Sequence, residues 1–351
     1  MSSSSLTPYQ SRVIGALLGV HAGDSLGATF EFTTHAWIIE NYPNGLRDIV
    51  GGGAFNWKAG HATDDTDMTR AILLAYQDLH RLPEEKKKQD TKESNIVYLA
   101  ADHFLEWFTG NNWPDRRPNS RPDDIGGATA SGLSSYTSSH NPFTSGAGPG
   151  SAGNGSLMRC IPTAAFAADS DTRFKDSIQI SAITHDDPRC TAACAAYNEI
   201  AAELIKGSSP EAAVAAGERL LEDIASRPVE KLNKESLITG AKLVLSAIQL
   251  GRQLSIPDLA QNGPPSTLPG KCGGFVLETL TLGIAAVLDT RSFDDVLVDV
   301  VRIGKDTDTN GAVAGGLLGA RDGVEAIPEA WREIIQFGKE FYDIALELTS
   351  S

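Results

Sequence analysis

Residues 304–320 read GKDTDTNGAVAGGLLGA, and this stretch is the strongest guide to the fold. Its first part carries Asp306, Asp308 and Thr309, and its second part is apolar and rich in small residues. The glycines of the second part stand three to four residues apart, at Gly311, Gly315, Gly316 and Gly319. Residues at that spacing share one side of a helix, and glycines there let a neighbouring helix approach closely. We therefore expect a tightly packed helix that brings an acidic turn toward distant parts of the chain.

Apolar residues at helical spacing continue through most of the remaining sequence. A stripe predicts a helix over Asp67–Leu82, which Pro83 ends. Ser209 and Pro210 are typical of the start of a helix over Pro210–Ile224. Ser292 followed by Asp295 is an acidic variant of the capping box and predicts a helix over Phe293–Ile303.

Two segments are apolar on nearly every side, Leu237–Leu250 and Val276–Leu288. Such segments are expected as helices buried at the centre of a large bundle. The sequence has neither a convincing alternating strand pattern nor a βαβ rhythm. The pattern therefore indicates an all-α fold.

Three stretches interrupt the helical pattern. Glu84–Ser94 is charged and lacks apolar spacing, which is more typical of a solvated loop or insertion than of a binding element. Asn111–Asp124 is rich in Pro, Arg and Asn, and Ser134–Gly155 is rich in Ser and Gly. The candidate chemistry lies inside the last two stretches, so we interpret them as functional loops on a rigid scaffold.

The composition is that of a globular protein with a pronounced negative charge. The 351 residues are 41% hydrophobic and 21% charged, which allows a sizeable core. The formal net charge of −15 disfavours nucleic acid and anionic membranes as partners. The four cysteines lack the spacing of a zinc site or a disulfide scaffold, and the N-terminal segment lacks the pattern of a signal peptide. We expect a cytoplasmic monomer, with a nuclear location also open.

A second acidic cluster lies near the N-terminus in GHATDDTDMT, residues 60–69, and contains Thr63, Asp64 and Asp65. Acidic residues before a helix can simply cap it and oppose its dipole. Two such clusters, each with an Asp pair and a Thr, favour a different interpretation. Four carboxylates brought together repel one another strongly, and hard cations such as Mg²⁺, Mn²⁺ and Ca²⁺ prefer oxygen ligands. Two divalent ions would balance the four aspartates.

Three loop motifs hold further candidate residues. Backbone N–H groups in the glycine-rich stretch 148–159 can cradle phosphate, although a flexible loop without a ligand fits it equally well. Its natural contacts are Ser151, Gly153, Asn154 and Gly155. Asp124 stands in PDDIGGAT, before a pair of glycines. His185, in THDDPRC, could be a base, a ligand or a hydrogen-bonded helix terminator.

Two common motifs are absent. Lys271 and Lys305 each follow a glycine, but neither is followed by Ser or Thr, so neither belongs to a Walker-type phosphate loop. The HExxH helix of zinc proteases is missing, and the seven histidines do not cluster. Nucleoside triphosphate hydrolysis and zinc proteolysis are therefore disfavoured.

Taken in order, these motifs resemble the ADP-ribosylglycohydrolase family, and in particular its dinitrogenase-reductase-activating branch. They are GVHAGDSLGATFEF from Gly19, GGG from Gly51, GHATDDTDMT, PDDIG, AGNGSLMRCIP (152–162), ITHDDP from Ile183, and GKDTDTNGAVAGGLLGA. The resemblance runs over some 300 residues and implies a compact, single-domain orthogonal helix bundle over residues 1–351, with a dinuclear Mg²⁺ or Mn²⁺ cleft. It further implies a hydrolase that removes ADP-ribose from a modified protein or small molecule.

The resemblance also implies roles for individual residues. The metal-ligand positions of the family fall on Thr63, Asp64, Asp65, Asp306, Asp308 and Thr309. Glu31 falls on a position that reaches the metals and acts in catalysis in some members, and Asp124 aligns with a proposed acid/base. The substrate-binding positions fall on Ser151, Gly153, Asn154, Gly155 and His185.

Two positions depart from the family pattern. Lys305 stands where a glycine often precedes the second acidic turn, and Asp187 replaces a second histidine found in some relatives. Both affect the expected specificity. The branch favours an N-glycosidic ADP-ribosyl-arginine linkage, while serine-linked ADP-ribose, poly(ADP-ribose) and ADP-ribose esters remain alternatives, as does a catalytically silent protein with a binding or structural role.

Overall fold

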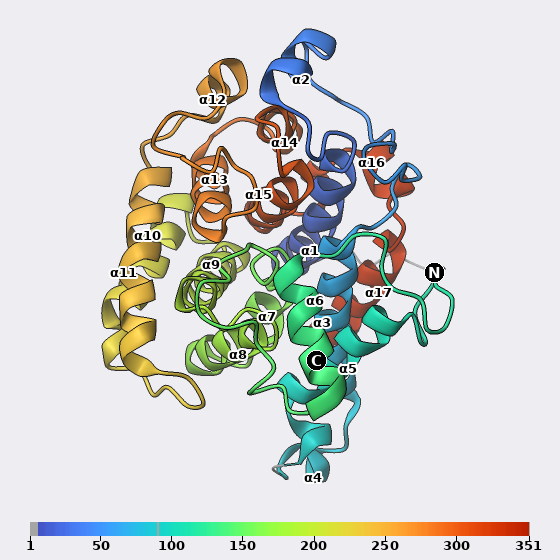
Figure 1. Ribbon diagram of the computed structural model, residues 1–351, viewed down its shortest axis with the longest axis vertical. Coiled ribbons are helices and arrows are strands. Elements are labelled where there is room, and N and C mark those ends of the chain that lie inside the picture. Colours follow the sequence, from blue (N-terminus) through green and yellow to red (C-terminus); the bar gives the residue numbers. More distant parts are fainter. Residues whose placement is uncertain (1–5, 90, 351) are drawn as a thin grey trace.

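The computed structural model describes residues 6–89 and 91–350 (Figure 1). Residues 1–5 and 351, at the ends of the predicted domain, and residue 90, inside the predicted insertion 84–94, lie outside the described residues. The prediction that residues 1–351 form a single domain stays a prediction.

The regular elements of the described chain are α-helices (α) and short 3₁₀ helices (η), joined by loops. In the first half these are α1 (Pro8–Gly27), α2 (His35–Asn41), α3 (Asp64–Arg81), α4 (Glu84–Lys87), η1 (Lys92–Ser94), α5 (Ile96–Thr109), α6 (Gly127–Ser139), α7 (Ile161–Phe166) and α8 (Ser170–Ala182). In the second half they are α9 (Pro188–Lys206), α10 (Pro210–Glu222), η2 (Asp223–Ala225), α11 (Lys234–Gly251), α12 (Ile256–Asn262), α13 (Val276–Leu288), α14 (Phe293–Arg302), α15 (Thr307–Asp322), η3 (Val324–Ala326), α16 (Glu329–Ile334) and α17 (Gly338–Thr349).

The predicted all-α class is confirmed. In the part of the chain that the structure describes, the only β-type pairings are two isolated bridges, Gly52 with Trp57 and Gly153 with Phe275. Over the same residues, no helix is both long enough and apolar enough to span a membrane.

The centre of the molecule is the pair formed by α1 and α15 (Figure 1). A Cβ atom added at Gly19 would collide with the backbone carbonyl of Gly315, and one added at Gly23 would collide with that of Gly311. The same collision arises between Gly319 and Gly15. Glycines at four-residue spacing on both helices therefore allow direct backbone contact, as the sequence predicted.

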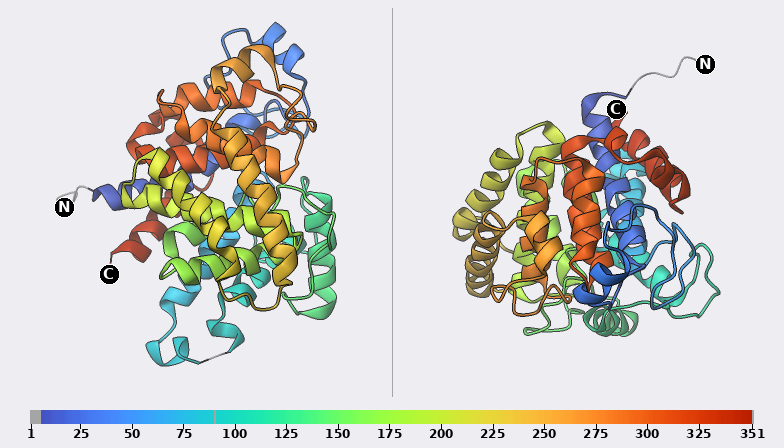
Figure 2. Two further views of the ribbon diagram at one scale, coloured as in Figure 1. Left: turned by 90° about the vertical axis from the view of Figure 1, so that its left-hand side faces the viewer. Right: turned by 90° about the horizontal axis from the view of Figure 1, so that it is seen from above.

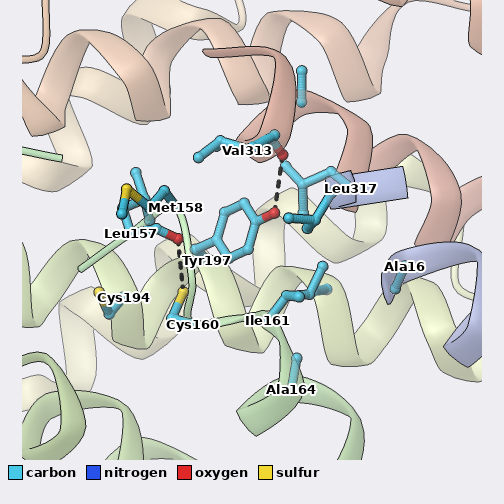
Figure 3. Packing of buried hydrophobic residues seen from close by; sticks show 14 of the residues in the cluster. Ala16, Leu157, Met158, Cys160, Ile161, Ala164, Cys194, Tyr197, Val313 and Leu317 are labelled. Carbon is cyan, nitrogen blue, oxygen red and sulfur yellow. Dashed lines mark hydrogen bonds between the residues drawn. The ribbon is translucent and has the colours of Figure 1, made fainter. Parts of the chain in front are cut away.

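Gly316 faces a different neighbour. A Cβ there would lie 2.6 Å from the hydroxyl of Tyr197, which α9 inserts against α15. The Tyr197 hydroxyl donates a hydrogen bond to the Val313 carbonyl at 2.9 Å (Figure 3). On the outer side of α9 lie α8, α10 and α11, whereas α3 and α17 pack beside α1 (Figure 1).

Several predicted helix ends are confirmed. Ser209 accepts a hydrogen bond from the Ala212 N–H at the start of α10, and Ser292 accepts one from the Asp295 N–H at the start of α14. Helix α3 ends at Arg81, just before Pro83. Its start was predicted near Asp67 but lies at Asp64, because the Thr63 side chain caps the Asp65 N–H.

The predicted burial of Leu237–Leu250 is wrong in part. This segment lies in α11, where one face is buried but Leu243 is 46% exposed. The reason is the position of α11 in the outer layer, which the left panel of Figure 2 views from outside. Val276–Leu288 is buried along nearly its whole length, as expected. The charged stretch 84–94 contains α4 and η1, neither with a buried residue.

The contact between α1 and α15 generates a stability prediction. Gly19→Ala forces the two backbones apart and should lower the free energy of unfolding by about 1–3 kcal/mol, the usual cost of overpacking. Gly127→Ala, in α6, is the matched control, since a Cβ there meets nothing within 4 Å. Chemical denaturation of both variants measures the difference. Equal stability of the two variants would contradict the packing argument.

Candidate metal and substrate site

The two acidic turns, far apart in sequence, meet at the carboxylate of Asp65. The Thr309 hydroxyl, 244 positions away, donates a hydrogen bond to Asp65 Oδ2 at 3.3 Å. The Thr63 hydroxyl donates to the same oxygen at 3.3 Å. Asp64 and Asp65 occupy the first turn of α3, and Asp308 and Thr309 the first turn of α15. The first turns of α3 and α15 thus meet at one point.

Asp24, which the sequence analysis did not select, holds the first of these turns. It lies fully buried near the end of α1, and its Oδ2 accepts hydrogen bonds from the Thr63 N–H at 3.1 Å and the Thr66 N–H at 3.2 Å. The Thr66 hydroxyl donates to the same oxygen. Asp24 is the one acidic residue of this glycine-rich, largely buried helix, and that is the signal that could have identified it.

A second group of carboxylates lies close together at the site. One oxygen from each of Glu31, Asp306 and Asp308 lies within 4.8 Å of the other two. The Asn154 side-chain amide donates to Asp306 Oδ2 at 2.7 Å and to the Thr279 hydroxyl at 2.9 Å. The glycine-rich loop is therefore tied to the acidic turn through Asn154.

Burial and mutual repulsion raise the pKa of these carboxyl groups. Burial first, and then the charges of Asp24 and Asp306, raise the pKa of Asp64 to about 7. Burial and then Asp124 raise the pKa of Glu31 to about 9. The pKa values of Asp65 and Asp308 are also raised well above their ordinary range, mainly by burial. The negative charge of the cluster is therefore uncompensated by the protein itself.

The donor set fits divalent cations. Glu31 Oε2, Asp65 Oδ1 and Asp308 Oδ1 are buried and accept no hydrogen bond from the described residues. Buried polar atoms without partners are costly, and these belong to carboxylates that converge. Oxygen-only ligands at such a point suit hard cations. The acidic cluster could therefore bind metal ions.

A cavity of about 470 Å³ opens above the carboxylates. Its lining includes most of the predicted site residues, namely Glu31, Asp64, Asp124, Gly153, Asn154, Gly155, His185, Asp306, Asp308 and Thr309. Thr63 and Asp65 are buried behind this lining, at 1% and 0% exposure. Ser151 is not brought to the cavity; its hydroxyl donates to the Ala147 carbonyl at 3.4 Å.

The glycine-rich loop differs in detail from the expected phosphate cradle. The backbone N–H of Asn154 donates to the Gly274 carbonyl at 3.1 Å, so this N–H is already paired. The N–H of Gly150 donates to Asp187, and the N–H of Gly148 donates to Asp186. Asp187, one of the two departures from the family pattern, therefore fixes this loop.

Phe32 and Lys305 form part of the cavity wall and were not selected as site residues. The Phe32 N–H donates to the Lys305 carbonyl at 2.7 Å, and the Lys305 N–H donates to the Thr33 carbonyl at 2.7 Å. Both residues have positive φ, 63° and 72°, a strained conformation for side chains other than glycine. Lys305, the second departure, thereby holds the segment that carries Glu31 against the second acidic turn.

Comparison with known proteins identifies the family to which the chain belongs. The family model described as ADP-ribosylglycohydrolase matches residues 5–351. The chain belongs to the ADP-ribosylglycohydrolase family. The predicted family is thus confirmed, and with it the assignment of the chain to a family of hydrolases.

Two curated relatives are similar along most of their length. An ADP-ribosylarginine hydrolase of Pseudomonas putida is 27% identical over 350 residues, covering 98% of this chain and 80% of the relative. An ADP-ribosyl-[dinitrogen reductase] glycohydrolase of Rhodospirillum rubrum is 28% identical over 322 residues, covering 91% and 88%. A solved ADP-ribosylglycohydrolase-related protein complex shares the fold, with a TM-score of 0.71 at 24% identity over 98% of this chain and 99% of that chain.

The uncompensated carboxylates generate a prediction for metal binding. Adding Mg²⁺ or Mn²⁺ should raise the unfolding temperature, because an ion that binds only the folded state stabilises it by about 2.7 kcal/mol at a hundred times its Kd. Asp308→Asn removes a buried carboxylate oxygen of the cluster and should abolish most of this gain. The exposed Asp48→Asn is the control and should keep it. Thermal unfolding with and without the ions tests this, and an equal gain for Asp308→Asn would refute the assignment.

Proposed function

We propose that this protein is a metal-dependent hydrolase that removes ADP-ribose from a modified acceptor, with an N-glycosidic ADP-ribosyl-arginine linkage as its substrate. The observation that carries the proposal is the meeting of two acidic turns at Asp65 beneath a cavity lined by further carboxylates. The relatives from Pseudomonas and Rhodospirillum are named for cleavage of ADP-ribosyl groups, and one of them for the arginine linkage.

The proposed ions are two Mg²⁺ or Mn²⁺, held by Thr63, Asp64, Asp65, Asp306, Asp308 and Thr309, with Glu31 beside them. When bound, such ions would orient the hydroxyls of the distal ribose and position a water near its anomeric carbon. The ligand set supports hard cations, because it consists of carboxylate and hydroxyl oxygens.

Asp124 is the proposed acid/base. It lies in the cavity wall, outside the convergent group of Glu31, Asp306 and Asp308. Burial first, and then the charges of Asp64 and Asp306, raise the pKa of Asp124 to about 8. A carboxyl group with such a pKa can hold a proton near neutral pH and deliver it to a leaving group, as other glycosidases do.

The remaining cavity residues would hold the ADP-ribosyl group. Gly153 and Gly155 present backbone without side chains to the cavity, and His185 lies against them. The Asn154 side-chain amide donates a hydrogen bond to Asp306 and so holds this loop beside the second acidic turn. Ser151 fits a substrate-binding role only if the ligand extends beyond the cavity described above.

A linkage assay tests the proposal. Purified protein with Mg²⁺ is incubated with arginine-linked and, separately, serine-linked ADP-ribosyl peptides, and the products are identified. We expect free ADP-ribose and unmodified arginine peptide. Release from the serine peptide alone would reassign the linkage, and AMP would indicate attack on the pyrophosphate instead. No turnover together with no metal binding would indicate a silent member of the family.

Asp124→Asn should lower kcat by at least about 100-fold, the contribution typical of general acid–base catalysis, while the Kd for ADP-ribose stays close to that of the wild type. The neighbouring Asp123→Asn is a matched control, since Asp123 is exposed and is not part of the cavity lining. Steady-state kinetics and calorimetry measure the two quantities. If ADP-ribose binding is also lost in Asp124→Asn, the residue positions the ligand and is not the acid/base.

A further inference from the structure

Arg159 is a fully buried cation that the proposed chemistry does not use. Its Nη1 donates to the Gly155 carbonyl at 2.8 Å, and its Nη2 donates to the Thr184 hydroxyl at 2.7 Å. The guanidinium carbon lies 4.5 Å from the centre of the Phe104 ring. Burying a charged guanidinium costs free energy unless it makes hydrogen bonds. The groups that Arg159 orients through its hydrogen bonds therefore indicate its role.

The Thr184 hydroxyl continues from Arg159 to His185. It lies 2.8 Å from His185 Nδ1, and Thr184 is fully buried. A guanidinium has only donors, so the hydroxyl must accept from Arg159 and its own hydrogen remains to be placed. Among the described residues, His185 Nδ1 is the one acceptor that the structure gives this hydrogen. Buried hydroxyl hydrogens are nearly always paired, so the hydroxyl donates and Nδ1 accepts.

The opposite nitrogen of His185 then carries the ring hydrogen and faces the cavity. Nε2 has no hydrogen-bond partner in the described chain, and His185 forms part of the cavity wall. A Cβ added at Gly155 would lie 3.3 Å from Nε2, and one added at Gly153 would lie 3.5 Å from it. The two glycines therefore leave open space in front of this N–H.

The ring is also kept neutral. Burial first, and then the positive charge of Arg159, lower the pKa of His185 to about 3. A neutral ring has one donor and one acceptor, so fixing the role of Nδ1 fixes the role of Nε2.

We infer that Arg159 and Thr184 hold His185 in its Nε2–H tautomer, so that His185 donates a hydrogen bond to an oxygen of the ligand lying over Gly153 and Gly155 and does not transfer a proton. Arg159 binds the Gly155 carbonyl and the Thr184 hydroxyl at once. It therefore positions the backbone under the ligand and, through Thr184, the ring of His185. The identity of the ligand as an ADP-ribosyl group rests on the proposed function. The acceptor is a phosphate oxygen or a ribose hydroxyl.

Nitrogen NMR of the substrate-free protein tests the tautomer without any assay of activity. In uniformly ¹⁵N-labelled protein at neutral pH, long-range proton–nitrogen spectra distinguish a protonated ring nitrogen from an unprotonated one, and His185→Gln assigns the signals. We expect protonated Nε2 and unprotonated Nδ1. A protonated Nδ1, or a mixture of tautomers, would overturn the inference.

Substitutions at His185 show whether this residue acts as a hydrogen-bond donor or as a base that transfers a proton. Glutamine can still donate from its amide but cannot accept a proton at neutral pH, whereas alanine does neither. We expect His185→Ala to weaken ADP-ribose binding by about tenfold, as for loss of one hydrogen bond to a ligand, and His185→Gln to weaken it less. Equal losses of kcat in both variants by about 100-fold or more would show that His185 transfers a proton.

Inorganic pyrophosphate, compared with ADP-ribose, identifies the acceptor oxygen. If His185 contacts a phosphate, His185→Ala weakens binding of both probes, and if it contacts a ribose hydroxyl, only ADP-ribose binding is weakened. Unchanged binding of both probes would contradict the proposed contact.

The role of Thr184 is tested by a matched pair of variants. Thr184→Val keeps the shape but removes the hydroxyl, and should raise KM and the Kd for ADP-ribose by about three- to tenfold with little change in kcat. Thr184→Ser restores the hydroxyl and should restore both values. An unchanged Kd for ADP-ribose in Thr184→Val would refute the positioning role. If this variant fails to fold, the proton–nitrogen spectrum of the wild type still decides the tautomer.

The tautomer measurement is independent of the proposed function, whereas the binding tests with ADP-ribose rest on it. If the wild type cleaves no ADP-ribosyl linkage but shows the Nε2–H tautomer, the function is wrong and the part of the inference that concerns the tautomer stands. If it cleaves the arginine linkage and shows the other tautomer, the inference alone is wrong.

Discussion

The direct backbone contact between α1 and α15 is the constraint on which the site depends. Helices separated by larger side chains pack with their axes about 8–10 Å apart, and glycine on both surfaces permits a closer approach. At Gly19 and Gly315 the structure has no room for a single added carbon atom. Because each helix is continuous with a segment of the site, this approach fixes where Asp24, at the end of α1, lies relative to Thr307 and Asp308, at the start of α15. A small separation of the helices would move the two halves of the acidic cluster apart.

The site itself works against the stability of the fold. Glu31, Asp65 and Asp308 bury carboxylate oxygens that no described donor satisfies. Such buried, unpaired carboxylates persist only where the surrounding packing holds them in place. The buried core of α1, α9 and α15 provides that packing. Asp24 shows how the scaffold contributes, because its hydrogen bonds to the first turn of α3 fix Thr63 and Thr66 without adding a group to the cavity wall.

Local patterns were sufficient for much of the fold and of the candidate site. The caps at Ser209 and Ser292, the end of α3 before Pro83 and the tight packing at Gly311–Gly319 follow from short-range rules, and the structure agrees with them. The acidic turns could be recognised because two similar motifs occur in one chain. That they meet at Asp65 required the structure, since no local rule sets the path between them.

What the sequence did not predict depends on tertiary contacts. The apolar surface of α11 resembles that of a central helix, but its layer is the outermost, so Leu243 remains exposed. Asp24 is a single acidic residue in a glycine-rich helix, and its partners Thr63 and Thr66 lie 39 and 42 residues further along the chain. Ser151 belongs to the same loop as Gly153, yet the turn directs its hydroxyl to Ala147. Lys305 was recognised as unusual, but its backbone pairing with Phe32 became apparent only in three dimensions.

The span of sequence between the two acidic turns has a consequence for biosynthesis. The Thr309 hydroxyl and Asp65 are separated by 244 positions, so the ribosome must add all of the intervening residues before the two acidic turns can meet. Contacts of such long range carry a large entropic cost of loop closure and form late in folding. Until α15 has been added, α1 therefore lacks the helix against which Gly15, Gly19 and Gly23 pack.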